Sequence, residues 1–193
     1  MCKEKIFASD INVGPLKKAE LDIEAACCTG RINLLLCNGL DGYNPDDIDT
    51  IVVAGMGGDT ITGILDRAEW CCKPGMRLIL QPVTKPEILR FWLVNNEFKI
   101  TDERYVSENG TIYQIICAEP GKSEKYCDAE LFVGSFNQIR NLDLFEEVMS
   151  LHVKRFENEV SSLEKAENRE LRCWQAMLQN IIIELQSEMG KVD

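Results

Sequence analysis

Several features common in proteins are missing from this chain of 193 residues, and each absence excludes a class of protein. No apolar run approaches the ~18 residues that a membrane-spanning helix needs. The first residues, Met1 to Ile6, contain no apolar signal core. We therefore expect a cytoplasmic protein that does not contact a membrane.

Sequence patterns of the commonest metal and catalytic sites are also missing. The chain has nine cysteines but no Cys-x-x-Cys, and its single histidine, His152, is far from any cysteine cluster. No metal site is therefore expected, and scattered free thiols suit a reducing compartment. The chain also contains no Gly-x-x-x-x-Gly-Lys, Gly-x-Gly-x-x-Gly or Gly-x-Ser-x-Gly element, which argues against a phosphate-binding loop and a serine nucleophile.

Positive charge is scarce. The chain has 21 Lys and Arg against 32 Asp and Glu, for a net charge of -11. General electrostatic attraction to nucleic acid is excluded, so any RNA contact would need a local basic patch. The apolar share of 45% is that of a globular protein, and the length allows one full domain with an appendage.

The first 120 residues alternate strand-like and helix-like segments. This alternation predicts a mostly parallel, Rossmann-like α/β sheet, and Asn109-Gly110 predicts a closing antiparallel hairpin. The expected strands are 5–9, 32–36, 49–54, 76–80, 98–106 and 110–118, and the expected helices are 15–28, a segment ending near 68, and 85–96.

The last third of the chain has a different pattern. Residues 121–135 are polar and follow Pro120, so we interpret them as a linker. From residue 136 to 193, apolar residues recur every three to five positions, which predicts a helical hairpin resembling a coiled coil. Its turn is expected near Glu164–Arg169. The predicted domains are therefore 1–120 and 136–193, and a monomer is favoured.

Two short segments follow the first two predicted strands, where open α/β sheets bind ligands. Asp10-Ile11 follows the first strand, and a carboxylate there could accept hydrogen bonds from both hydroxyls of a ribose. Asn38-Gly39 follows the second strand, and its amide could meet the edge of an adenine. In each case a plain turn is the alternative interpretation.

A third segment, Ala54-Gly55-Met56-Gly57-Gly58, lies between a buried strand and a helix. Three glycines around one methionine expose the backbone, and free amides lie at the start of the helix. A tight turn does not need that many glycines. We therefore expect this loop to bind a ligand or to position a reacting group, although it offers no general base.

The order of these segments resembles that of class I S-adenosylmethionine-dependent methyltransferases. More closely, Ile51–Gly58 (IVVAGMGG), Arg77–Pro82 (RLILQP), Leu89–Leu93 (LRFWL) and the Glu108-Asn109-Gly110 hairpin are similar to the bacterial tRNA (adenine(22)-N1)-methyltransferase family. The similarity runs from about Lys5 to the end of the chain. It implies an enzyme that uses S-adenosylmethionine as cofactor and methylates N1 of adenosine 22 in tRNA.

The resemblance also implies roles for the three segments. Asp10 and Ile11 would lie at the cofactor ribose, and Asn38 and Gly39 at its adenine, where many relatives have Asp instead of Asn. Ala54 and Gly55 would also contact the cofactor. Gly55 to Gly58 would position the methyl donor against the target base, and the helical tail would grip the tRNA.

The chain departs from the family pattern at its beginning. The family starts with a strand, a loop that binds the methionine part of the cofactor, and a helix, whereas this chain starts at the following strand. That first strand is central in the fold, so we expect a gap in the middle of the sheet. The alternative function is therefore that of a shortened, catalytically impaired relative that binds tRNA or a protein.

Overall fold

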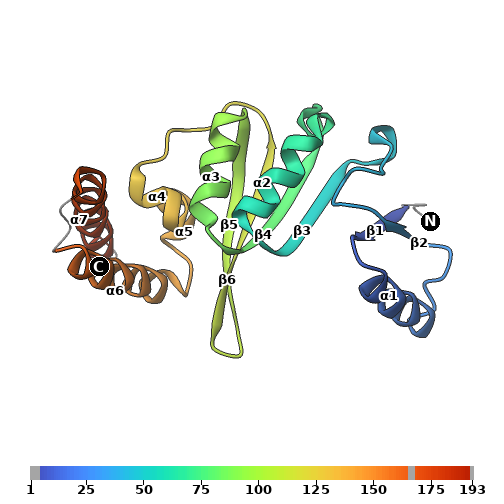
Figure 1. The fold of residues 1–193 in the computed structure, drawn as a ribbon, viewed down its shortest axis with the longest axis horizontal. Coiled ribbons are helices and arrows are strands. Elements are labelled where there is room, and N and C mark those ends of the chain that lie inside the picture. Colours follow the sequence, from blue (N-terminus) through green and yellow to red (C-terminus); the bar gives the residue numbers. More distant parts are fainter. Residues whose placement is uncertain (1–4, 165–167, 192–193) are drawn as a thin grey trace.

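The computed structural model describes residues 5–164 and 168–191. Figure 1 shows three parts along the molecule: an amino-terminal unit up to residue 36, a central sheet between residues 50 and 120, and a group of helices between residues 128 and 189. Across the described ranges, no helix has the length and apolar character needed to cross a bilayer.

The amino-terminal unit is a small parallel β–α–β arrangement. Strand β1 (Ile6–Asp10) leads into helix α1 (Val13–Ala25), and strand β2 (Ile32–Leu36) returns beside β1. All three elements lie within a few residues of their predicted positions. Among residues 5–50, however, no side chain is buried. Two strands and one helix offer too little apolar area to form a core of their own.

The central sheet combines parallel and antiparallel strands, as predicted. Its order is β3-β4-β6-β5, in which the β3–β4 pair is parallel and the other pairs are antiparallel. Helices α2 and α3 pack on it and cover a core that includes Ile51, Leu65 and Leu80. The bounds are β3 Thr50–Gly57, α2 Gly58–Arg67, β4 Arg77–Thr84, α3 Pro86–Asn95, β5 Phe98–Glu108 and β6 Thr111–Pro120, with short 3-10 turns at Pro45–Asp47 and Glu69–Cys72.

The strands form two separate sheets. Strands β1 and β2 pair with each other, the other four strands form a second sheet, and within the described residues no strand joins the two. The expected gap in the middle of the sheet is therefore confirmed. It lies between β1 and β3.

Strand β4 is longer than the predicted strand 76–80 because it continues through Pro82. The Arg77 amide donates to the Asp49 carbonyl of the segment that leads into β3, so the backbone of Arg77 points toward β3. The backbone groups of the even-numbered residues of β4, which include Pro82, therefore point toward β6. Pairing between β4 and β6 covers only Leu78–Leu80. The missing N–H of Pro82 therefore removes no bond from the sheet.

The helical group has its own core. Helices α6 (Phe145–Ser162) and α7 (Arg169–Met189) pack against each other, which confirms the predicted helix pair. Of the expected turn at 164–169, residues 165–167 lie outside the described residues. Phe145, Phe156 and Leu178 are fully or almost fully buried in this core.

The linker expected at 121–135 needs correction, because its second half is folded. Helix α4 (Asp128–Val133) buries Ala129, Phe132 and Val133, and a four-residue helix, α5 (Phe136–Ile139), follows it. Glu130 stabilises the start of α4 by accepting a hydrogen bond from the Cys127 amide at 3.0 Å. This segment therefore belongs to the helical group.

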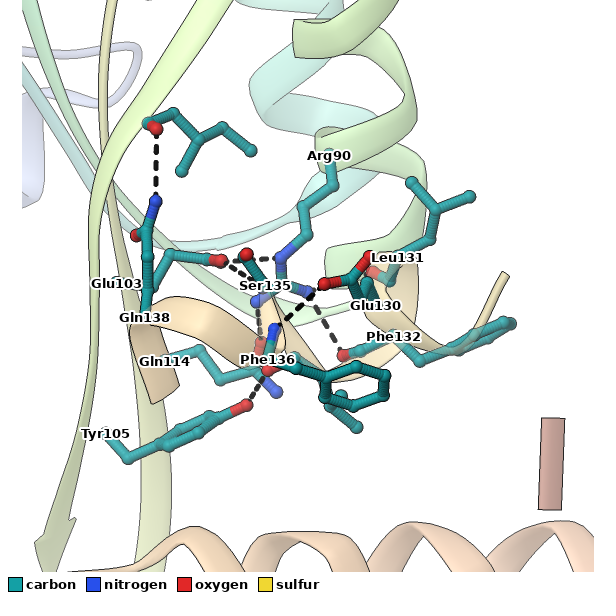
Figure 2. A network of polar contacts seen from close by, with 12 residues as sticks. Arg90, Glu103, Tyr105, Gln114, Glu130, Leu131, Phe132, Ser135, Phe136 and Gln138 are labelled. Carbon is teal, nitrogen blue, oxygen red and sulfur yellow. Dashed lines mark hydrogen bonds and ion pairs between the residues drawn. The ribbon is translucent and has the colours of Figure 1, made fainter. Parts of the chain in front are cut away.

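A buried arginine attaches the helical group to the sheet (Figure 2). Arg90 of α3 is 1% exposed, and its Nε donates to Oε1 of Glu103 on β5 at 2.7 Å. One terminal nitrogen donates to the carbonyls of Leu131 and Phe132 in α4, at 2.9 and 3.1 Å. The other donates to Oε1 of Gln114 on β6 at 2.8 Å. One side chain thus joins four elements.

The same cluster also fixes the chain after α4. Oε2 of Glu103 accepts a hydrogen bond from the Ser135 amide at 2.7 Å, and the Tyr105 hydroxyl donates to the Val133 carbonyl. Burial raises the pKa of Tyr105, so its hydroxyl keeps the donated proton. A Cβ at Gly134 would lie 2.7 Å from Oε2 of Glu103, so only glycine fits beside this carboxylate.

Candidate functional site

Asp10 ends β1 and organises the start of α1. Its carbonyl accepts a hydrogen bond from the Cys37 amide at 3.2 Å, which holds the end of β1 beside the end of β2. Its Oδ1 accepts one from the Asn12 amide at 2.7 Å, so Asp10 forms a turn with Asn12. Within the described residues, Oδ2 has no hydrogen-bond partner and is available to a ligand. Ile11 is 63% exposed.

The Asn38-Gly39 segment lies next to the end of β1, because the Ser9 hydroxyl donates to the Gly39 carbonyl at 3.0 Å. Gly39 has a φ of 62°, and a Cβ there would lie 2.8 Å from a side-chain carbon of Ile64 on α2. Glycine at 39 is therefore explained by backbone conformation and packing. Asn38 is exposed and remains a candidate for binding. The structure thus brings the first two segments together and connects them to α2.

The glycine-rich segment differs from the predicted loop because β3 continues through it to Gly57. The pairing register between β3 and β4 shifts on both sides of Met56, which makes this a bulged strand end. Gly55 has a φ of 76°, and no atom lies within 4 Å of where its Cβ would be. Met56 is 39% exposed. Ala54 and Gly55 therefore leave an open stretch of backbone, as expected.

Packing explains the other two glycines. A Cβ on Gly57 would lie 2.7 Å from Oδ1 of Asp59 and 3.0 Å from the Thr84 hydroxyl, and a Cβ on Gly58 would lie 2.1 Å from the Lys85 carbonyl oxygen. Helix α2 therefore starts in direct contact with the chain between β4 and α3. Gly58 is buried in this contact, and its predicted role beside the reacting groups is not needed to explain why the residue is glycine.

Gln81 belongs to this site, although no sequence motif predicts it as a site residue. Its Oε1 accepts a hydrogen bond from the Gly55 amide at 2.8 Å and so holds the left-handed turn from the neighbouring strand. Its Nε2 is buried and has no partner in the described part of the chain. The one sequence feature that could have indicated a site residue is the position of Gln81 at the end of the RLILQP segment, directly before the proline.

A surface ion pair closes this side of the site. Lys85, which has a left-handed φ of 53°, places its Nζ 2.8 Å from Oδ2 of Asp59 in the first turn of α2. The hydrogen bond from Lys85 holds the pKa of Asp59 below its usual value. Both side chains are about half exposed, so the pair helps to order the loop but stabilises the fold little.

A family model described as "TrmK: tRNA (adenine(22)-N(1))-methyltransferase" matches residues 2–187, nearly the whole chain. The chain belongs to this family. The resemblance found in the sequence motifs is thereby confirmed, and with it a Rossmann-like methyltransferase fold that carries a helix pair at its carboxyl end.

A curated member of the family, the tRNA (adenine(22)-N(1))-methyltransferase of Bacillus subtilis (strain 168), is 30% identical over 135 residues. The match includes 67% of this chain and 57% of that relative. The matched part therefore spans little more than half the length of the Bacillus protein.

Solved structures share the fold over almost the whole chain. An uncharacterised protein of Listeria monocytogenes serotype 4b is 26% identical, with a TM-score of 0.78 over 96% of this chain and 83% of its own. Sp1610 of Streptococcus pneumoniae, solved in complex with S-adenosyl-L-methionine, is 29% identical, with a TM-score of 0.70 over 93% and 81%. A Streptococcus agalactiae protein of the NADB-Rossmann superfamily is 26% identical, with a TM-score of 0.72 over 96% and 80%. Part of each solved chain has no counterpart here.

Proposed function

We propose that this chain transfers a methyl group from S-adenosylmethionine to N1 of adenosine 22 in tRNA. The observation that carries the proposal is the family match over residues 2–187. The curated relative named for this reaction and the similar structure that contains S-adenosyl-L-methionine support it.

The residues at the ends of β1 and β2 fit the cofactor. Asp10 has one carboxylate oxygen free for a ribose hydroxyl, and the exposed amide of Asn38 can hydrogen-bond to the edge of an adenine. At the end of β3, open space beside Gly55 leaves room for a group close to the backbone. These three residues would hold the cofactor in the proposed site.

The reaction asks for positioning more than for acid–base chemistry. When bound, S-adenosylmethionine supplies a methyl group made electrophilic by its sulfonium. Adenine N1 has a free lone pair, so no residue must first remove a proton from it. The bulged end of β3, held in place by Gln81, would align the base, and alignment alone can supply a large part of a rate enhancement. The adenine must leave its stack to reach this site.

A second candidate function is binding of tRNA or a protein without catalysis. The break between β1 and β3 favours it, because residues 5–50 contain no buried side chain to fix Asp10 and Asn38 firmly. The two functions differ in one measurable property, which is methyl transfer by a chain that has been shown to bind the cofactor.

The test is a calorimetric titration of the whole chain with S-adenosylhomocysteine, followed by a methylation assay on tRNA read at adenosine 22. We expect micromolar binding that Asp10→Ala weakens about ten- to a hundredfold, the range of a hydrogen bond to a charged group. Asp10→Asn keeps the acceptor for the Asn12 amide, so it separates the turn from the ligand contact. Asp22→Ala, on the exposed surface of α1, is the matched control.

Equal affinity of the unaltered chain and Asp10→Ala would contradict the proposed site. Binding of S-adenosylhomocysteine without methylation of tRNA would favour the second function over the first.

A further inference from the structure

The hairpin formed by β5 and β6 projects beyond the rest of the central sheet. Strand β4 pairs with β6 only over Leu78–Leu80, whereas β5 and β6 stay paired as far as Glu108 and Thr111. Figure 1 shows that the hairpin extends past the edge of the sheet at which β3 and β4 end and α2 and α3 begin. The same edge carries Gly55 and Gln81 of the candidate site. A large substrate that reaches this site therefore meets the hairpin beside it.

The projecting part of the hairpin starts from a fixed base. Tyr105 and Gln114 lie opposite each other on the two strands, on the side of α3 and α4. The Tyr105 hydroxyl donates to the Val133 carbonyl, and Oε1 of Gln114 accepts from Arg90 at 2.8 Å. Beyond this base, three more cross-strand pairs lead to the turn: Val106 with Tyr113, Ser107 with Ile112, and Glu108 with Thr111. The hairpin is thus a braced arm.

One side of this arm is apolar and open. Neighbouring residues along a strand face opposite sides of a sheet, so the Val106–Tyr113 pair points away from α3 and α4. Gln81 points to the same side, because Leu80 next to it is buried in the core beneath the helices. Val106 is 45% exposed and Tyr113 is partly exposed. Within the described residues, the Tyr113 hydroxyl has no hydrogen-bond partner.

The arm is nearly neutral, although the protein as a whole is acidic. From Tyr105 to Ala118 the one charged residue is Glu108, whereas charged residues make up 27% of the chain and its net charge is -11. Repulsion of phosphate groups is therefore weaker here than over most of the surface. Serine, asparagine and threonine at the tip offer hydrogen bonds to ribose hydroxyls, and a tyrosine ring can stack on a base. This chemistry suits RNA.

We propose that Val106–Tyr113 is an arm that contacts the tRNA substrate beside its target nucleotide. Tyr113 and Val106 pack against a base or a ribose, and the polar residues of the tip hydrogen-bond to the sugar–phosphate backbone around it. The identity of the RNA rests on the proposed function. The contact itself rests on the position, the open apolar side and the low charge of the arm.

A change of charge on the arm is the first test, and its readout is binding of an unmodified tRNA transcript with adenosine at position 22. Glu108→Lys changes the charge at the tip, and Glu97→Lys makes the same change at the other end of β5, roughly 35 Å away. We expect Glu108→Lys to strengthen binding about five- to tenfold at about 50 mM salt and to steepen the salt dependence by about one counterion. Glu97→Lys should change the affinity about twofold or less.

Removal of the ring is the second test. Tyr113→Ala should weaken binding of the same transcript about tenfold, whereas Tyr113→Phe keeps the ring and should bind like the unaltered chain. Phe91→Ala is the matched control, because Phe91 is 60% exposed in α3, which covers the other face of the sheet. Thermal unfolding by circular dichroism checks that each variant is folded. If Tyr113→Ala does not fold, the comparison of the two lysine variants decides.

Equal effects of Glu108→Lys and Glu97→Lys, with Tyr113→Ala binding as well as Phe91→Ala, would overturn the proposal. The proposed function would still stand if the unaltered chain methylates tRNA. Selective effects of the arm variants on tRNA binding, without methylation by the unaltered chain, would keep this proposal and reject the proposed function. A dimer mass in light scattering that Tyr113→Ala reduces to one protomer would make a second copy the partner of the arm and overturn the proposal.

Discussion

Replacing Arg90 by methionine should cost more stability than any surface substitution, because the change leaves a carboxylate buried without its partner. Arg90 and Glu103 are 1% and 2% exposed, and the guanidinium also donates to two carbonyls of α4 and to Gln114. Breaking a buried pair by removing one partner costs about 3–5 kcal/mol. Domains of this size are stable by about 5–15 kcal/mol, so Arg90→Met would remove a large fraction of the total.

The assay is urea unfolding followed by circular dichroism, with a control of the same substitution type. Arg104→Met removes a guanidinium that lies 3.1 Å from Asp102 at the surface, where the two side chains are 56% and 44% exposed. A pair of this kind contributes about 1 kcal/mol or less. The double variant Arg90→Met/Glu103→Leu should recover part of the loss, because no charge then stays buried.

Equal losses in Arg90→Met and Arg104→Met would refute the reasoning, because burial would then make no difference to the cost. Glu103→Leu is measured as well. If the free energy lost by the double variant equals the sum of the losses in Arg90→Met and Glu103→Leu, the two charges do not interact.

The remaining predictions concern a glycine contact and a buried histidine. Gly58→Ala should destabilise by about 1–3 kcal/mol because its Cβ would collide with the Lys85 carbonyl, whereas Gly63→Ala, in the same helix with open space, should stabilise by about 0.5–1 kcal/mol; thermal unfolding compares them, and equal shifts would contradict the contact. Burial, with a smaller contribution from Arg155, lowers the pKa of His152 to about 4. The neutral histidine therefore contributes fully to the free energy of unfolding above pH 6.5. As the pH falls from 6.5 toward 4, the free energy of unfolding decreases by up to about 1.4 kcal/mol per pH unit, because the histidine becomes protonated in the unfolded chain first. Urea unfolding of the unaltered chain and His152→Phe at pH 7.5 and 5 measures this, and parallel losses in both would exclude the histidine.

Elements with strong local signals could be predicted from the sequence. Strand Ile32–Leu36 lies where its apolar run predicts. Asn109 and Gly110 have φ values of 50° and 77°, the left-handed pair that an Asn-Gly hairpin turn requires. The gap between β1 and β3 also followed from comparing the order of segments with that of the family. In each case the information lies in neighbouring residues or in their order.

Features that depend on contacts across the fold could not be predicted. Phe98 and Ile100 are buried on β5 as alternation expects, but an irregularity between Ile100 and Asp102 shifts the phase and turns Glu103 inward. Its partner, Arg90, lies in an otherwise ordinary helix, so nothing local marks it as buried. In the same way, the glycine-rich pattern predicts that Gly58 belongs to a ligand-binding loop, whereas its close contact with the Lys85 carbonyl is set by the fold.

The absence of buried side chains in residues 5–50 has a consequence for the order in which the protein folds. Along the described residues, the first buried side chain is Ile51. The central sheet closes only when distant parts of the chain meet, because β4 pairs with β6 through contacts such as Leu78 with Ala118. Residues 5–50 depend on that sheet, against whose core Leu40 and Ile48 pack, and therefore become ordered after it.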